Sequence, residues 1–310
     1  MKLISNIVFT KNRPLQLNGY LESMYRYFPP EQIQTYVLWK QELFTQEYER
    51  LFSRYPTCIV VRERDFSDDF FKILNQIETK YILFGVDDVV YFDSVEISLI
   101  DAAFEIAGND ILGFSLRFGY NVLNNGKDKV VEDEIEGQKI YKLNWQGGQT
   151  ENTSYPFELC ATIYRTELVK KIVHSSRSHN KLAIILFSPD SVLIKGLRKL
   201  RMAGKAKRIL KDFGFFYNPN VLEHWVCKWC KENAENLPAY IYFKKASASA
   251  IQVNLVNIRK SEAAYEDWEH AVETLNEKYQ KGWVLDTDFI AEHKPTDTHC
   301  GKESFKLIKK

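Results

Sequence analysis

The first hundred residues alternate between short apolar runs and longer amphipathic stretches. Runs rich in β-branched and aromatic side chains predict strands, and apolar residues that recur every three or four positions predict helices. The expected strands cover residues 6–10, 35–39, 57–61 and 81–86, and the expected helices cover residues 15–28, 46–55, 68–78 and 95–106. Successive strand–helix units of this kind imply a mostly parallel, doubly wound sheet with right-handed crossovers.

The second half of the chain is less regular. Its pattern predicts strands over residues 111–117 and 157–164, a polar hairpin over residues 129–134 and 138–143, and a helix over residues 166–174. It further predicts a helix over residues 222–232, a strand over residues 251–256 and a long helix over residues 265–279. We therefore expect an α/β fold, with a mostly parallel sheet flanked by helices, a small hairpin and a helical C-terminal extension.

Composition and charge narrow the class of protein. The chain has 310 residues, of which 45% are hydrophobic, so it can bury a large core. Its net charge of +1 gives no support for nucleic-acid or membrane binding from bulk charge. Five scattered cysteines favour a reducing compartment, and no apolar run is long enough to cross a bilayer or to serve as a signal peptide. We expect a cytoplasmic protein.

Two adjacent carboxylates end the fourth predicted strand. Asp87 and Asp88 follow the apolar run 81–86, and the chain then becomes apolar again. Neighbouring like charges beside apolar surface are costly unless a cation lies between them or water reaches them. The pair therefore indicates a metal site, and a solvated turn or a helix N-terminus is the alternative.

Further polar clusters follow the first and third predicted strands. Ligands of such sheets bind beyond the carboxyl ends of the strands, where these clusters share an edge with Asp87 and Asp88. This convergence predicts a binding cleft, although a helix start with exposed bases would also explain the first cluster. The residues in question are Thr10, Lys11 and Arg13 after the first strand, and Arg62, Arg64 and Asp65 after the third.

Residues 7–14, Ile-Val-Phe-Thr-Lys-Asn-Arg-Pro, resemble the opening of GT-A type glycosyltransferases. Residues 81–92 resemble the Asp-x-Asp region of that family in a variant form, because Val86 stands where the first acid is usual. Segments 155–165, 218–223 and 275–282 are similar to bacterial glycosyltransferases of polysaccharide assembly. The resemblance implies a GT-A-like, Rossmann-like sheet and the transfer of a sugar from a nucleotide sugar, most readily a UDP-sugar.

The resemblance also implies roles for particular residues. Asp88 would coordinate Mn²⁺ or Mg²⁺, and His299 corresponds to a late histidine that many members supply to the same metal. Thr10, Lys11, Arg13, Arg62, Asp65 and Asp87 would contact the nucleotide, with a helix N-terminal acid as the other reading of Asp65. Residues 1–120 would bind the donor, residues 121–260 the acceptor, and residues 261–310 would form the extension. The acceptor would be a growing cell-surface glycan or its lipid carrier.

An inverting enzyme needs a base near the acceptor hydroxyl, whereas a retaining enzyme does not need it in the same place. The candidates are Glu158, Asp190 and Glu223. We prefer Glu223 because the Asn-Pro-Asn turn at 218–220 places the start of the following helix near a cleft. The alternative is an acid on a helix surface. The neighbouring His224 is a weaker candidate for the metal, and the pair Cys227 and Cys230 fits helix packing better than a metal knuckle.

A strongly basic stretch lies in the second half. Residues 195–211 carry eight lysines and arginines and no acid, with apolar residues between them. A solvated helix face is the ordinary explanation of such a run. The more specific alternative is an anionic partner, either lipid headgroups at the inner face of the plasma membrane or a phosphate-bearing acceptor. Nucleic acid ranks last, because interleaved aromatic residues are missing.

Two other classes of function remain. A nucleotidyltransferase on the same type of sheet would need a Gly-rich phosphate loop, and residues 9–14 contain no glycine. A noncatalytic module that binds anionic surfaces through the basic stretch is the other alternative.

Overall fold

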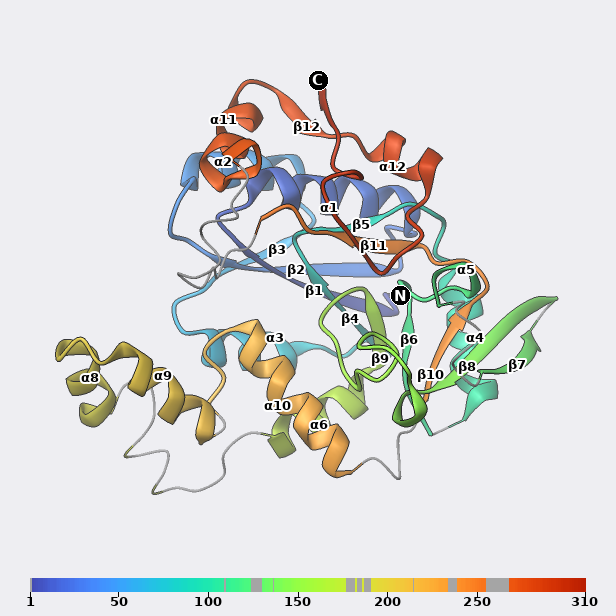
Figure 1. Cartoon of the computed structure of the whole chain (residues 1–310), viewed down its shortest axis with the longest axis horizontal. Helices are drawn as coiled ribbons and strands as arrows, with labels where there is room; N and C mark the ends of the chain where they lie inside the picture. Colours follow the sequence, from blue (N-terminus) through green and yellow to red (C-terminus); the bar gives the residue numbers. More distant parts are fainter. Residues whose placement is uncertain are drawn as a thin grey trace.

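The computed structural model describes residues 2–108, 110–123, 130–135, 137–176, 182, 186, 191–213, 215–233, 239–254 and 268–310. A nine-stranded sheet with the order β3-β2-β1-β4-β9-β6-β10-β8-β7 runs through these residues. Within it, β8 and β9 run opposite to the other described strands. The predicted α/β fold with a mostly parallel sheet is confirmed (Figure 1).

The first part of the sheet has the predicted alternation. Its elements are β1 (Ile4–Lys11), α1 (Pro14–Tyr27), β2 (Ile33–Lys40), α2 (Thr45–Arg54), β3 (Ile59–Arg62), α3 (Phe66–Gln76), β4 (Tyr81–Val86) and α4 (Ile97–Ala107). Strand β1 is parallel to β2 on one side and to β4 on the other, with Phe9 opposite both Leu38 and Val86. Their carboxyl ends therefore finish at the same level, and the polar residues that follow them meet at one edge.

Helices cover both faces of the sheet. Side chains of α1, α2 and α4 pack in one core with Ile4 and Val8 of β1. Side chains of α3, α6 (Thr166–Ser176) and α10 (Pro219–Glu232) pack in a second core with Ile7 and Phe9. Because successive residues of a strand point to opposite faces, β1 contributes to both cores, which accounts for its consecutive apolar residues Ile7, Val8 and Phe9.

The remaining strands depart in places from the sequence pattern. They are β6 (Ile111–Ser115), β7 (Val130–Ile135), β8 (Gln138–Asn144), β9 (Thr162–Arg165) and β10 (Ala239–Phe243). The predicted hairpin is confirmed as β7 and β8, and β10 was not predicted. The strand predicted from residue 157 begins only at Thr162. The residues before Thr162 are mostly apolar because they are buried. They do not form a strand, because the Glu158 amide bonds to the Tyr164 hydroxyl and because Ala161 has a φ of 51°, outside the range of extended backbone.

A small sheet joins the middle of the chain to its C-terminal part. Strand β11 (Ala248–Ile251) lies between β5 (Val89–Tyr91) and β13 (His299–Cys300). The strand predicted over residues 251–256 shares only Ile251 with β11, because the residues that pair with β5 and β13 begin at Ala248. Residues 255 and 256 lie outside the described part of the chain. This sheet brings the residues that follow β4 beside residues more than two hundred positions later.

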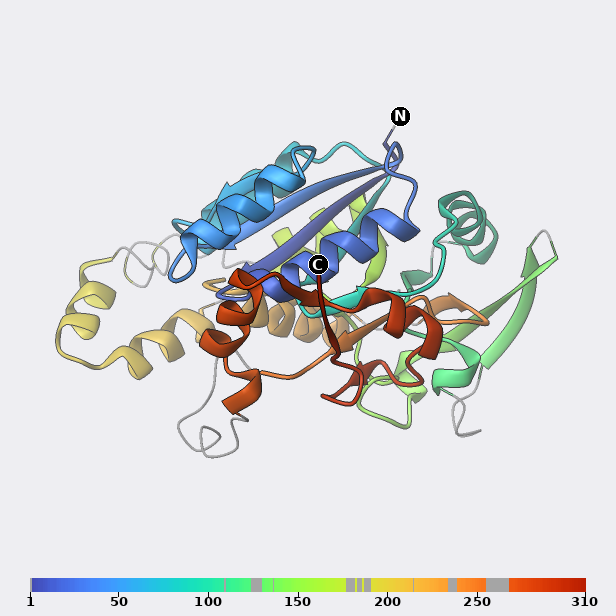
Figure 2. The ribbon, with the colours of Figure 1, turned by 90° about the horizontal axis from the view of Figure 1, so that it is seen from above.

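The C-terminal segment packs along α1. It comprises η4 (Trp268–His270), α11 (Val272–Gln280), β12 (Trp283–Leu285), α12 (Thr287–His293), β13 and β14 (Leu307–Lys309). The expected helical extension thus contains strands as well, and its long helix begins at Val272, because Ala271 is extended; residues 265–267 are not described. The contact with α1 is close: a Cβ on Gly19 would lie 2.7 Å from Cδ2 of Leu285. Figure 2 shows the segment lying over α1.

Two short elements and a helical hairpin complete the described structure. Beyond α5 (Tyr120–Leu123) and η1 (Trp145–Gly147), α8 (Val192–Lys199) and α9 (Ala203–Asp212) form a hairpin with its own small apolar cluster. Figures 1 and 2 show this hairpin projecting from one end of the molecule. A search of the described helices finds none with the length and apolar character needed to span a bilayer.

Candidate functional site

A cavity of about 680 Å³ lies beyond the carboxyl ends of β1, β2 and β4. This volume is in the range of pockets that hold small molecules and cofactors. The walls come from the strand ends, from the start of α10 and from the small sheet. The lining residues are Phe9, Thr10, Lys11, Arg13, Leu38, Lys40, Glu42, Glu63, Val86, Asp87, Asp88, Leu159, Cys160, Tyr217, Asn218, Pro219, Asn220, Glu223, Gln252 and His299.

The cavity gathers most of the residues singled out from the sequence. Those that line it are Thr10, Lys11, Arg13, Asp87, Asp88, Glu223 and His299. Arg62, Asp65 and Glu158 are not among its lining residues, and Asp190 lies outside the described residues. The common edge expected for the first and fourth strands therefore exists, whereas after the third strand Glu63 lines the cavity and the predicted Arg62 and Asp65 do not.

Asp87 forms the buried floor of the site. Its Oδ1 accepts a hydrogen bond from Nη1 of Arg13 at 2.9 Å, and its Oδ2 accepts one from the Thr10 hydroxyl at 2.9 Å. The Tyr48 hydroxyl lies 2.7 Å from Oγ1 of Thr10 and accepts the Arg13 backbone amide at 2.8 Å. Burial raises the pKa of the Asp87 carboxyl, and the Arg13 charge opposes that rise. These contacts fix the loop after β1 to the loop after β4.

Asp88 has one partnered oxygen and one that faces no donor. Nη1 of Arg13 lies 3.1 Å from Oδ2 of Asp88, while the buried Oδ1 has no hydrogen-bond partner among the described residues. The Asp88 backbone carbonyl accepts the Ile251 amide at 2.8 Å, so the small sheet holds this residue in place. A buried carboxylate oxygen without a partner is costly, which marks the position as one that a cation or donor would complete.

Arg13 joins the two acids to a distant part of the chain. Its side chain is 7% exposed, and its Nη2 donates to the backbone carbonyl of Asn254. One guanidinium charge faces the carboxylates of Asp87 and Asp88, so the three groups together keep one net negative charge. The floor of the cavity therefore still attracts a cation. The role of Asn254 had no signal in the sequence, because a carbonyl contact can come from any residue type.

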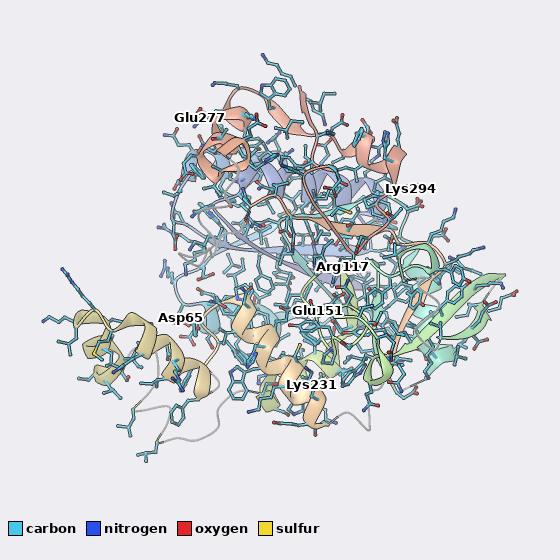
Figure 3. All side chains as sticks on the ribbon, viewed as in Figure 1. Asp65, Arg117, Glu151, Lys231, Glu277 and Lys294 are labelled. Carbon is cyan, nitrogen blue, oxygen red and sulfur yellow. The ribbon has the colours of Figure 1, made fainter. Side chains whose placement is uncertain are left out.

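His299 reaches the cavity from β13 and lies against Arg117. Nη1 of Arg117 is 3.0 Å from Nε2 of His299. Burial and the neighbouring Arg117 charge lower the pKa of His299 to about 4, so the imidazole is neutral at physiological pH. Arg117, labelled near the middle of the molecule in Figure 3, is itself buried. It pairs with Glu158 and donates to the backbone carbonyls of Cys160 and Thr298. Sequence reasoning missed Arg117, although it ends a predicted strand at the same edge of the sheet.

Glu223 occupies the opposite wall, in the first turns of α10. Asn218 caps this helix by accepting the Val221 amide at 2.9 Å, and Pro219 occupies its first position. The Asn-Pro-Asn segment does place a helix start at the cavity, but α10 begins at Pro219 and not at residue 222. Oε1 of Glu223 accepts the Leu159 amide at 3.0 Å. Burial raises the pKa of Glu223 to about 7. A carboxyl poised near neutral pH in a cavity has the character of a general base.

Paired charges line the side of the cavity below β2. Nζ of Lys11 lies 2.9 Å from Oε2 of Glu42, and Nζ of Lys40 lies 3.2 Å from Oε1 of Glu63. Burial raises the pKa of Glu63. Of these four residues, only Lys11 was singled out from the sequence. The others lie in or just after strands whose charged ends look like ordinary solvated turns.

Three predicted residues have other surroundings. The Asp65 carboxylate accepts the Asp68 amide at 3.0 Å and caps α3, which is the alternative reading of this residue (Figure 3). Arg62 is exposed at the end of β3. Glu158 is buried and engaged by Arg117 and by the Thr162 hydroxyl, so its carboxylate is not open to an acceptor. The nucleotide-contact and catalytic roles of these residues stay predictions.

A divalent ion fits the donor set in part. The unpartnered Oδ1 of Asp88 is a hard oxygen ligand, and the neutral His299 lines the same cavity. Within the described residues, no three His, Cys, Asp or Glu side chains form a cluster that could hold an ion. Mg²⁺ is typically held by one or two carboxylates together with substrate phosphates and water, and such a site needs no larger protein cluster.

The sequence of this chain was compared with protein families and with known proteins. No family model matches the chain. The chain is 22% identical over 195 residues to the bifunctional glycosyltransferase pgtA of Dictyostelium discoideum. This chain resembles a glycosyltransferase. The matched region is 54% of this chain and 24% of pgtA, so the chain spans about a quarter of that protein's length. The resemblance to an enzyme of this class, inferred from the sequence, is confirmed.

Two solved structures show a weak overall similarity to this chain. A structure of S. aureus TarS in complex with UDP-GlcNAc has a TM-score of 0.37 and 22% identity, covering 55% of this chain and 47% of that one. The mannosyltransferase PcManGT from Pyrobaculum calidifontis, in complex with GDP-Man and Mn²⁺, has a TM-score of 0.36 and 11% identity, covering 90% and 80%. These scores are too low to carry an argument, so the fold rests on the strand order above.

Proposed function

We propose that this protein is a metal-dependent glycosyltransferase that moves a sugar from a nucleotide sugar, most readily a UDP-sugar, to a hydroxyl of a growing cell-surface glycan or a lipid-linked acceptor. The observation that carries the proposal is the juxtaposition of the loops after β1 and β4. It gives the cavity a fixed acidic floor and leaves Oδ1 of Asp88 without a partner. The sequence similarity to pgtA supports the class of reaction.

The donor diphosphate would lie between the loop after β1 and Asp88. Lys11 presents an ammonium group at this edge, beside Glu42. Asp88, through Oδ1, and His299 would hold Mn²⁺ or Mg²⁺, and positive charge from the ion would offset the charge that grows on the departing diphosphate. Arg13 keeps the Asp88 carboxylate in one orientation, because it is itself held by Asp87 and by the Asn254 carbonyl.

Glu223 would remove the proton from the acceptor hydroxyl in an inverting reaction. It lines the same cavity as the acidic pair, and its pKa of about 7 leaves a large fraction ionised at neutral pH. The Leu159 amide bonds to Oε1 of Glu223, and the Tyr155 side chain also hydrogen-bonds to this carboxyl, so both groups would orient it toward the acceptor. Glu158 and Asp190 remain the other candidates from the sequence. Of these, Glu158 is already bonded to Arg117 and Thr162.

The five cysteines are free thiols in the structure, which accords with a reducing, cytoplasmic location for this enzyme. The expected division of labour, with residues 1–120 on the donor side and residues 121–260 on the acceptor side, is consistent with the placement of Thr10 and Asp88 on one wall and Glu223 on another.

Calorimetric titration with UDP, GDP, CDP and CMP, each with and without Mn²⁺, tests this function. We expect one diphosphate to bind, with an affinity that Mn²⁺ raises about tenfold or more, equivalent to about 1.4 kcal/mol. Asp88→Ala should abolish the Mn²⁺ effect. Asp110→Asn, which removes only an exposed ion pair with Lys142, should leave it unchanged. Failure of all four nucleotides to bind would overturn the proposal.

A further inference from the structure

The α8–α9 hairpin is set apart from the rest of the molecule. Its buried residues Ile194, Ala206, Leu210 and Phe215 form a cluster separate from the cores that hold the sheet. Figures 1 and 2 show the hairpin extending away from the body of the protein in both views. Most of its surface therefore faces solvent, and its exposed side chains are not needed to cover the sheet.

The hairpin exposes aliphatic side chains where a solvated helix would carry polar ones. Val192 is 89% exposed, Leu200 is 71% exposed, and Leu193 is also exposed. Leu193 and Leu200 are seven residues apart, which is about two helical turns, so they project from the same side. Single exposed aliphatic residues are ordinary, but several on one short helix and its following turn form an apolar patch without a partner in the described structure.

Cations surround this patch. Arg198, Lys199, Arg201 and Lys205 are exposed, and none of them makes an ion pair within the described part of the chain. Arg198 and Lys199 end α8, where positive charge is favoured by the helix dipole. Arg201 lies in the turn before α9, with a φ of 59°. The apolar and cationic groups thus share one end of the hairpin.

A mixed patch of this kind has the chemistry of an anionic membrane surface. Exposed aliphatic side chains enter the boundary between headgroups and acyl chains, and the long stems of lysine and arginine let their charges reach lipid phosphates. A nucleic acid would offer the phosphates without the apolar phase, and it would leave Val192 and Leu200 in water. We propose that the α8–α9 hairpin docks this protein onto an anionic lipid bilayer.

The hairpin is continuous with the wall of the cavity. Tyr217 packs against the apolar cluster of the hairpin and also lines the cavity, and the chain then passes through Asn218 and Asn220 into α10. Docking would therefore set the side of the cavity that carries Glu223 near the bilayer. If the protein has the function proposed above, on which this step rests, docking identifies the acceptor as a membrane-anchored glycan or its lipid carrier.

Vesicle sedimentation of the full chain, without nucleotide or acceptor, tests the docking directly. Vesicles of phosphatidylcholine with phosphatidylglycerol should bind the protein at low salt, and binding should weaken at high salt. Vesicles of phosphatidylcholine should bind it far less. Because this measurement needs no sugar transfer, its result is independent of the glycosyltransferase proposal. Indifference to phosphatidylglycerol would overturn the docking and leave the proposed activity standing.

Two pairs of substitutions separate the charges from the apolar side chains. Arg198→Gln with Arg201→Gln should weaken vesicle binding about 30-fold, since each cation near an anionic surface contributes about fivefold. Val192→Ser with Leu200→Ser should weaken it about tenfold or more through lost apolar burial. Lys281→Gln with Lys309→Gln, which removes the same charge from the exposed C-terminal segment, should leave binding unchanged.

Two further measurements test whether the variants remain folded and whether the hairpin binds nucleic acid. Each hairpin variant should keep the nucleotide affinity of the parent protein, which would show that the sheet and the cavity remain folded. Fluorescence anisotropy with a single-stranded RNA should show no binding at the salt concentration at which vesicles bind. Tight RNA binding that Val192→Ser with Leu200→Ser leaves intact, together with weak vesicle binding, would overturn the proposal in favour of a nucleic-acid surface.

Discussion

The cavity floor and the α8–α9 hairpin are both rich in charge, but they differ in what surrounds those charges. On the floor, Arg13 is buried between Asp87 and Asp88, and its other end is held by a backbone carbonyl. On the hairpin, Arg198 and Arg201 face solvent. Buried charges must be satisfied by fixed partners inside the protein, whereas exposed charges can be satisfied by water and remain free to meet a partner. The first arrangement builds a rigid site, and the second builds a surface for docking.

The largest effect should come from removing the buried cation. Arg13→Ala leaves Asp87 and Asp88 facing each other without compensation, and breaking a buried pair in this way typically costs about 3–5 kcal/mol of unfolding free energy. Urea denaturation measures the loss. Arg26→Ala, which removes an exposed partner of Asp288, is the matched control and should cost about 1 kcal/mol or less.

Equal losses from the two arginine substitutions would contradict the contrast between buried and exposed charge. If Arg13→Ala does not fold, the addition of Asp87→Asn should restore a measurable transition. The double variant contains one buried acid rather than two, and the remaining Asp88 borders the cavity. No recovery in the double variant would show that Arg13 acts mainly through packing.

The next effect concerns Glu223, a carboxyl whose pKa is raised by burial. Because the pKa of Glu223 is raised to about 7, donor turnover should increase as the pH rises through that value and the carboxylate forms. Glu223→Gln should lower turnover by about 10²- to 10⁴-fold and should remove this limb of the pH profile. Release of the nucleotide from the donor, measured against pH, reports both results.

Glu232→Gln on the same helix is the control, since Glu232 is exposed and forms only a surface pair with Lys228.

Stability should follow the opposite trend from turnover. A carboxyl whose pKa is raised by folding binds its proton more tightly in the folded state, so the free energy of unfolding falls as the pH rises from the usual range of glutamate toward 7. Persistence of that slope in Glu223→Gln would assign it to another group.

The smallest effect should come from the hairpin. Arg198→Gln with Arg201→Gln removes two exposed charges that make no ion pair in the described structure, so we expect a change of about 0.5 kcal/mol or less in the free energy of unfolding. Urea denaturation under the conditions used for Arg13→Ala gives the comparison. A loss of several kcal/mol would show that these cations hold the hairpin together and are not reserved for a partner.

Much of the site could be anticipated from the order of strands. The loops that contain Thr10 to Arg13 and Asp87 to Asp88 follow parallel neighbouring strands, and the register between β1 and β4 brings them to one level. The Asn-Pro-Asn turn likewise predicted the start of α10 and hence the place of Glu223. Asp65 does not line the cavity: β2 and β1 lie between β3 and β4, and the Asp65 carboxylate caps α3, so its nucleotide contact stays a prediction.

The sequence by itself determined the strand–helix alternation, the sheet edge at which polar residues gather, and the candidates for a nucleotide and a metal. Local periodicity and turn chemistry are short-range properties, so they can be recognised along the chain. Only the tertiary structure decided that Arg13 bridges both acids, that Arg117 engages Glu158 and His299, and that β11 brings His299 beside the turn at Asp88. These contacts join residues far apart in the chain, and they depend on the register of a sheet that no local pattern specifies.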